Sequence, residues 1–112
     1  MLIVGGSGFV GSTLARSFAA LPDFEVFSTF HHDYTPEKGI SYVRLVRLDD
    51  KDVAKNLVQS VEPNVIVYCV GSNELSVTEP DGNLRPTQMA HSVGATHFLT
   101  ASDFVKAKFV YI

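Results

Sequence analysis

The chain has little of several features that would place it in a specialised class. Its 112 residues contain one cysteine, Cys69, which excludes an internal disulfide and is typical of proteins from a reducing compartment. No apolar run approaches the roughly 18 residues that a membrane-spanning helix needs. The N-terminal apolar run also lacks the basic flank of a secretory signal. We therefore expect a cytoplasmic protein without a membrane segment.

Positive charge is scarce as well. Nine basic residues stand against twelve acidic ones, giving a net charge of -3, and the sequence pI is near 5.7. Without a basic patch, nothing in the charge pattern favours nucleic acid or an anionic membrane as a partner. Histidines and cysteine are not clustered at ligand spacing, so we expect no metal site. The chain is long enough for one domain, and its composition is that of a globular protein.

What the sequence does contain is a glycine-rich turn at residues 5–11. It follows the apolar run Leu2–Val4 and opens a helical pattern, which is how a nucleotide-binding βαβ unit begins. In such a turn the first glycine adopts the tight bend, the second lets a pyrophosphate approach the backbone, and the third lets the helix pack closely. The first N–H groups of the helix then face the anion. The pattern predicts a pyrophosphate site made by Gly5, Gly8, Phe9, Val10 and Gly11; the alternative is a turn that serves packing alone.

Strands and helices alternate along the rest of the chain. The apolar patterns predict strands at residues 2–4, 24–30, 40–48, 65–70 and 109–112, and helices at residues 9–20, 49–62 and 87–105. The third strand has an alternative end near Val46, and Gly94 inside the last helix suggests close approach to a neighbour. This alternation predicts an α/β fold of the Rossmann type. We expect a parallel sheet in the order 3-2-1-4-5 with helices on both faces and a ligand crevice between the first and fourth strands.

We expect the residues at the end of the second strand to determine which cofactor binds. An acidic residue there would bond a ribose 2′-hydroxyl and repel a 2′-phosphate. The chain instead offers Ser28, Thr29, His31 and His32, and Asp33 lies late for this role. Hydroxyl and imidazole groups can donate to a phosphate, so we predict NADP(H), with NAD(H) as the alternative. In an extended backbone the two histidines would point in opposite directions.

These motifs together resemble a known family. The spacing G-x-x-G-x-x-G at residues 5–11 and the strand at residues 62–69 are similar to those of the extended short-chain dehydrogenase/reductases. Residues 28–32, Ser-Thr-Phe-His-His, resemble the strand end of the dTDP-4-dehydrorhamnose reductase branch. The resemblance implies hydride transfer between a nicotinamide cofactor and a 4-keto sugar nucleotide, with a tyrosine as the acid and a lysine that lowers its pKa. It leaves a homodimer open.

The resemblance also assigns residues after the later strands. It implies an adenine contact for Asp49, with Val46 or Arg47 as alternatives. It places the backbone of Val70, Gly71 and Ser72 beside the nicotinamide-side ribose, where the alternative is a plain strand-to-loop turn. The chain departs from the family at Val4, where threonine is common, and at His91, which aligns with an asparagine.

The catalytic Tyr-x-x-x-Lys of the family has no counterpart on a helix. Tyr34 and Lys38 match it by letters, but Pro36 and Gly39 predict a loop there. We therefore expect residues 1–112 to be the N-terminal cofactor-binding part of a longer reductase. Two alternatives remain, namely a non-catalytic regulatory subunit or redox sensor that binds NADP(H), and an NAD-dependent epimerase or dehydratase. Cys69 is expected to be a core residue and not a nucleophile.

Overall fold

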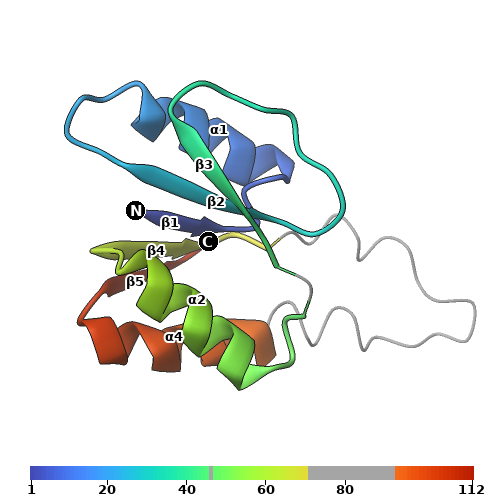
Figure 1. Ribbon diagram of the computed structural model, residues 1–112, viewed down its shortest axis with the longest axis vertical. Helices are drawn as coiled ribbons and strands as arrows, with labels where there is room; N and C mark the ends of the chain where they lie inside the picture. Colours follow the sequence, from blue (N-terminus) through green and yellow to red (C-terminus); the bar gives the residue numbers. More distant parts are fainter. Residues whose placement is uncertain (46, 71–92) are drawn as a thin grey trace, which may run out of the picture.

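Five strands and three helices make up the part of the chain that the computed structural model describes, residues 1–45, 47–70 and 93–112. The strands are β1 (Leu2–Val4), β2 (Val26–Phe30), β3 (Ile40–Arg44), β4 (Val65–Tyr68) and β5 (Lys108–Tyr111). The helices are α1 (Phe9–Ala19), α2 (Lys51–Val61) and α4 (Gly94–Val105). Their arrangement is shown in Figure 1.

The strands form one parallel sheet in the order β3-β2-β1-β4-β5. β1 lies at its centre, where Leu2 pairs with Phe27 of β2 and with Ile66 of β4. All three residues of β1 are fully buried, as expected for a strand that is covered on both faces. The predicted fold class and strand order are confirmed.

Helices cover both faces of the sheet because successive side chains of each strand point to opposite sides. On one face Ile3, Val26 and Val67 pack with Ala15 of α1. On the other, Leu2, Val4 and Ile66 pack in one cluster with residues of α2 and α4, among them Val58 and Phe98. Figure 1 shows α2 and α4 side by side on the face opposite α1. The sheet thus carries two hydrophobic cores, one on each face.

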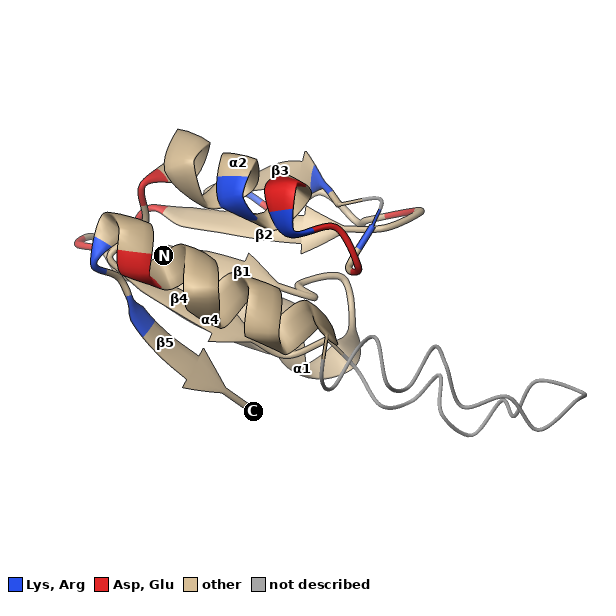
Figure 2. Cartoon of the chain, turned by 90° about the horizontal axis from the view of Figure 1, so that it is seen from below, with Lys and Arg blue, Asp and Glu red and all other residues tan. Residues whose placement is uncertain are grey.

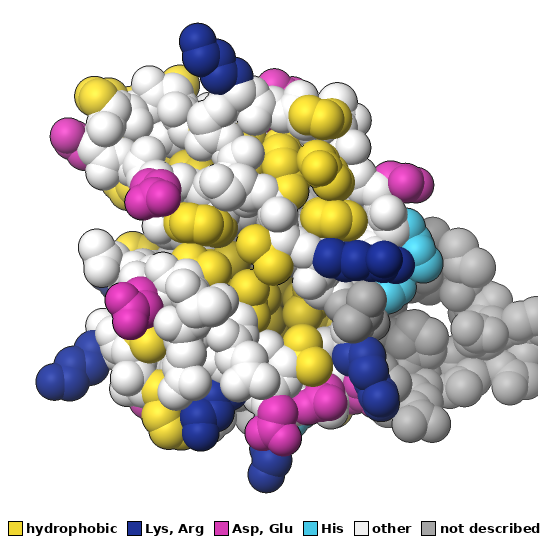
Figure 3. Space-filling model, viewed as in Figure 1, with side chains coloured by type: hydrophobic (Ala, Val, Ile, Leu, Met, Phe, Trp, Pro, Cys, Tyr) yellow, Lys and Arg dark blue, Asp and Glu magenta, His cyan; other side chains and the backbone are white. Residues whose placement is uncertain are grey.

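The two helices of the second face, α2 and α4, differ in the number of charged residues that they carry. α2 carries acidic and basic residues on its outer side, whereas α4 has a single charged residue, Asp103; Figure 2 shows this contrast. Asp50 caps α2 by accepting hydrogen bonds from the N–H groups of Asp52 and Val53, as the run of aspartates predicts. Figure 3 shows hydrophobic side chains at the surface between β3 and α2.

Several predicted boundaries were wrong by a few residues. β2 begins at Val26 and not at Phe24, because Phe24 donates its N–H to Leu21 in the preceding turn. β3 ends at Arg44, because its partner strand ends at Phe30, which pairs with it. β4 ends at Tyr68, two residues early, and the last helix is described only from Gly94. Residues 87–92, predicted to begin that helix, lie outside the described residues.

None of the described helices is long and apolar enough to cross a membrane. In the same residues no group of three or more histidine, cysteine, aspartate or glutamate side chains could hold a metal ion.

Candidate functional site

The glycine turn connects β1 to α1 at the carboxyl edge of the sheet. Gly5 has φ +89°, and a Cβ on it would lie 2.8 Å from both the N and the Cα of Val70. Its N–H donates a hydrogen bond of 2.8 Å to Oγ1 of the buried Thr29. The bend is therefore fixed from two sides, by the end of β4 and by the end of β2, and only glycine fits at position 5.

Gly11 is required for a different reason. A Cβ at this position would collide with the carbonyl oxygen of Gly5 and lie 2.8 Å from the Cα of Gly6. The missing side chain lets the first turn of α1 rest directly on the glycine turn. This is the close helix–strand packing that the third glycine of such a motif provides.

Gly8 contrasts with both, because nothing in the packing requires it to be glycine. Its backbone is extended, with φ -76° and ψ 174°, and a Cβ would meet only the carbonyl oxygen of Gly5 at an ordinary 3.5 Å. The residue is exposed, and Phe9 and Val10 beside it are 80% and 47% exposed. The open space next to Gly8 is where a ligand could approach the backbone.

The N-terminus of α1 is suited to an anion. Gly8 is its N-cap and supplies no side-chain hydrogen bond, so the first N–H groups of the helix lack a side-chain cap. The first turn contains no acidic residue. Together with the positive end of the helix dipole, these N–H groups favour a negatively charged ligand.

Ser28 lies beneath this turn and not on its outer surface. The side chain is fully buried, and its hydroxyl has no hydrogen-bond partner among the described residues. A Cβ on Gly6 would collide with the Ser28 hydroxyl. Direct contact of Ser28 with a surface-bound cofactor, which the sequence suggested, does not fit this position; Ser28 and Thr29 support the turn from below. The sequence signal for this supporting role is the pair of adjacent hydroxyl residues in an otherwise apolar strand.

The two histidines follow β2 and lie at the surface. Nδ1 of His31 is 3.1 Å from the carbonyl oxygen of Leu45, which ties the end of β2 to the segment after β3. The His31 and His32 rings meet edge to face with centroids 4.1 Å apart. The expectation that they point in opposite directions holds only for an extended backbone and does not apply here, because β2 ends at Phe30 and the backbone bends at the histidines.

The remaining predicted residues flank the turn on the β3 and β4 sides. Asp49 holds Arg47 through two hydrogen bonds of 3.0 Å, from Nε and Nη2 to its two carboxylate oxygens. Val70 is half-buried, and its backbone faces Gly5. Gly71 and Ser72 lie outside the described residues.

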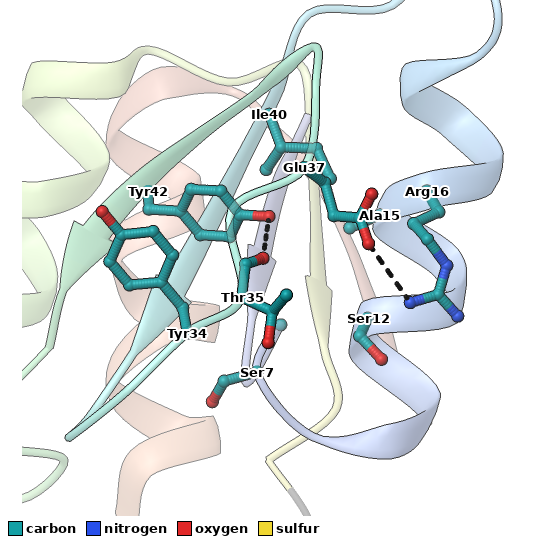
Figure 4. Close-up of a pocket in the computed structure, with 10 residues that line it drawn as sticks. Ser7, Ser12, Ala15, Arg16, Tyr34, Thr35, Glu37, Ile40 and Tyr42 are labelled. Atoms are coloured by element: carbon teal, nitrogen blue, oxygen red, sulfur yellow. Dashed lines mark hydrogen bonds and ion pairs between the residues drawn. The ribbon is translucent and has the colours of Figure 1, made fainter.

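A hollow that no sequence pattern indicates lies between α1 and the loop from β2 to β3. Its volume is about 210 Å³, and Tyr34 and Tyr42 stack at one side with centroids 4.2 Å apart. Tyr34 belongs to this loop and not to a helix, as Pro36 and Gly39 predict, so it cannot pair with Lys38 as a catalytic motif. The lining residues, drawn in Figure 4, are Gly6, Ser7, Ser12, Ala15, Arg16, Tyr34, Thr35, Glu37, Ile40 and Tyr42.

Cys69 is a core residue next to the site. It is 6% exposed, and its thiol donates to the carbonyl oxygen of Val4 at 3.3 Å. Burial raises the pKa of the thiol to about 11, so at neutral pH the side chain is protonated and is a poor nucleophile. Burial likewise raises the pKa of the neighbouring Tyr68 hydroxyl.

These raised pKa values predict a loss of stability at alkaline pH. Between pH 9 and 11 the unfolded chain loses the Cys69 proton while the folded chain keeps it, so the free energy of unfolding falls as the pH rises. The thiol accounts for on the order of 2 kcal/mol by pH 11. Urea unfolding at pH 7, 9 and 10.5 measures this decline. In Cys69→Ala the free energy of unfolding should fall less steeply and only from about pH 10, where tyrosine hydroxyls of the unfolded chain begin to lose their protons. An identical decline in both proteins would contradict the prediction.

Comparisons with known proteins agree with this geometry. The enzyme WbmH from Bordetella bronchiseptica, solved in complex with NAD+, superposes with a TM-score of 0.78 at 18% identity over 98% of this chain and 37% of that one. The UDP-Glc/GlcNAc 4-epimerase of Campylobacter jejuni gives 0.78 at 19% identity, over 98% of this chain and 35% of its own. Epimerase Mth375 from Methanothermobacter thermautotrophicus gives 0.72 at 23% identity, over 98% and 33%.

At these identities the structural likeness shows the fold, and the chain spans about a third of the length of those proteins. No curated protein matches the chain by sequence. The family comparison is more specific, because the NAD-dependent epimerase/dehydratase family matches over residues 1–112, the whole chain. This match confirms the resemblance to the extended short-chain dehydrogenase/reductases, although it does not distinguish a reductase branch. The glycine turn, the sheet order and the match together place the chain in the NAD-dependent epimerase/dehydratase family.

Proposed function

We propose that this chain is the cofactor-binding part of a sugar-nucleotide reductase that uses NADP(H). The observation that carries the proposal is Gly8, which the packing does not require to be glycine. It stands at the uncapped N-terminus of α1, where exposed backbone N–H groups favour an anion. A pyrophosphate that lies against this backbone accounts for both features.

The proposed cofactor extends from the turn in two directions. The backbone N–H groups of Phe9, Val10 and Gly11 would donate to its pyrophosphate, and Gly8, whose own N–H donates to the carbonyl oxygen of Gly5, would leave the space for it. Its adenosine half lies towards the ends of β2 and β3, where His31 and His32 are exposed and Asp49 is half-buried. Val70, Gly71 and Ser72, which follow β4 in the sequence, would hold its nicotinamide half. This direction follows the general rule that such ligands bind across the carboxyl ends of the strands at the switch point of the sheet.

The reduced nicotinamide, when bound, supplies the hydride for a keto group of the sugar. This chain's own residues bind and orient the cofactor, and no Tyr-x-x-x-Lys lies on a helix among the described residues. In the proposed reductase the catalytic tyrosine and lysine belong to the rest of a longer protein, which is supported by the length of the similar chains, of which this chain spans about a third. A similar structure, the Bordetella bronchiseptica enzyme WbmG, was solved with NAD and UDP, which supports a dinucleotide cofactor and a nucleotide-linked substrate.

Cofactor titration tests this proposal. Binding of NADPH and NADH is followed by calorimetry on the full-length protein, and we expect NADPH to bind more tightly. Consumption of NADPH with a 4-keto sugar nucleotide is then measured by absorbance. Binding of neither dinucleotide would overturn the proposal. Tighter binding of NADH with epimerisation and no net oxidation would replace the reductase with the epimerase alternative, and tight NADPH binding without turnover would favour the regulatory alternative.

A further inference from the structure

An ion pair closes one side of the hollow between α1 and the loop from β2 to β3. Nη1 of Arg16 lies 3.9 Å from Oε1 of Glu37, and the two side chains are 51% and 40% exposed. Figure 4 shows the guanidinium reaching from α1 towards the carboxylate of the loop. A pair this long and this exposed contributes little to stability. Either group can therefore exchange its partner for a ligand at small cost.

The hollow is continuous with the glycine turn. Gly6 and Ser7 of the turn line it, together with Ser12 and Arg16 of α1. Side chains of a helix tilt towards its N-terminus, and Figure 4 shows the Arg16 guanidinium directed towards Ser12, one turn earlier. The cation therefore faces the end of α1 at which the pyrophosphate is proposed to bind. A volume of about 210 Å³ leaves room for a phosphate group.

The loop that carries Glu37 is held in place by the two tyrosines. Tyr34 and Tyr42 stack, and the Tyr42 hydroxyl donates to the carbonyl oxygen of Thr35 at 3.1 Å. This positions the carboxylate at the hollow, while the described end of β2, Ser28 to Phe30, contains no acidic residue. Glu37 is thus the carboxylate that the hollow presents beside the turn, and Arg16 is its cation.

These two groups respond in opposite ways to the 2′ position of an adenosine ribose. A guanidinium binds a phosphate through two parallel hydrogen bonds. A carboxylate accepts a hydrogen bond from a 2′-hydroxyl and repels a 2′-phosphate. We propose that Glu37 competes with the 2′-phosphate of NADP(H) for Arg16, so that this ion pair sets the ratio of NADP(H) to NAD(H) affinity. The inference rests on the proposed function of the glycine turn.

Charge-neutral variants of the two residues test the competition. Glu37→Gln frees Arg16 and removes the repulsion, so we expect NADPH to bind about tenfold more tightly and NADH to change by less than about twofold. Arg16→Gln should weaken NADPH binding about tenfold with NADH again unchanged. In the double variant most of the gain from Glu37→Gln should disappear, because no cation remains to be released and only the lost repulsion is left. Dissociation constants are measured by calorimetry on the full-length protein.

Matched controls remove the same charges elsewhere. Glu25 precedes β2 and Lys108 is the first residue of β5. Glu25→Gln and Lys108→Gln should both leave the ratio of NADPH to NADH affinity unchanged. The inference is overturned if Glu37→Gln does not raise the ratio of NADPH to NADH affinity, or if the full gain persists in the double variant. If the wild-type protein binds either dinucleotide but the variants leave the ratio of NADPH to NADH affinity unchanged, this inference alone is wrong. Binding of neither dinucleotide would remove the proposed function with it.

Discussion

Alanine at Gly5 is expected to destabilise the fold strongly. The substitution forces a side chain into a backbone with φ +89° and places its Cβ 2.8 Å from backbone atoms of Val70. The conformational strain and the overpacking together amount to about 3–5 kcal/mol, against a typical domain stability of about 5–15 kcal/mol. Urea unfolding followed by circular dichroism measures the loss.

Gly39 supplies the control that separates strain from collision. Its φ is +85°, almost the same as that of Gly5, but a Cβ there would meet only Ala19 atoms at an ordinary 3.5 Å. Gly39→Ala should therefore cost only the conformational strain, about 1–2 kcal/mol. Equal losses from the two substitutions would show that the contact between the turn and the end of β4 does not constrain position 5.

The sequence predicts the sheet well because its signals are local and redundant. Each strand is a short apolar run, each helix shows its own apolar stripe, and Asp50 and Pro63 bound α2 at both ends. The order of the strands then follows the doubly wound topology, in which right-handed crossovers place helices on both faces of the sheet. Strand ends were less predictable, because they depend on the partner: Arg44 is the last residue of β3 only because β2 ends at Phe30.

The site is predicted only in part, for a related reason. Three glycines look alike in a sequence, and the structure alone shows that Gly5 and Gly11 are fixed by neighbouring backbone whereas Gly8 is not. The burial of Ser28 depends on which side chains of β2 face inward. The mixed polar and apolar composition of this strand does not show which they are. The contact between Arg16 and Glu37 joins residues 21 positions apart. No local spacing signals it, because a loop of irregular backbone brings the carboxylate to α1.

Gly8 offers the test in which stability and binding separate. Alanine there adopts an ordinary φ, and its Cβ meets only the Gly5 carbonyl oxygen at 3.5 Å. The change should therefore cost less than about 1 kcal/mol of folding free energy. If a pyrophosphate lies against this backbone, the added methyl group occupies its place. Loss of two hydrogen bonds to a charged group then weakens dinucleotide binding about a hundredfold or more.

The comparison of Gly8→Ala with Gly39→Ala makes this prediction decisive. Both add one methyl group in open surroundings, but only the first adds it at the N-terminus of α1. We expect Gly8→Ala to lose less than about 1 kcal/mol of stability but to lose NADPH and NADH binding together, since the pyrophosphate is common to both. Gly39→Ala should lose some stability and keep binding. Unchanged binding in Gly8→Ala would mean that the turn serves packing alone, which is the alternative that the glycine spacing by itself leaves open.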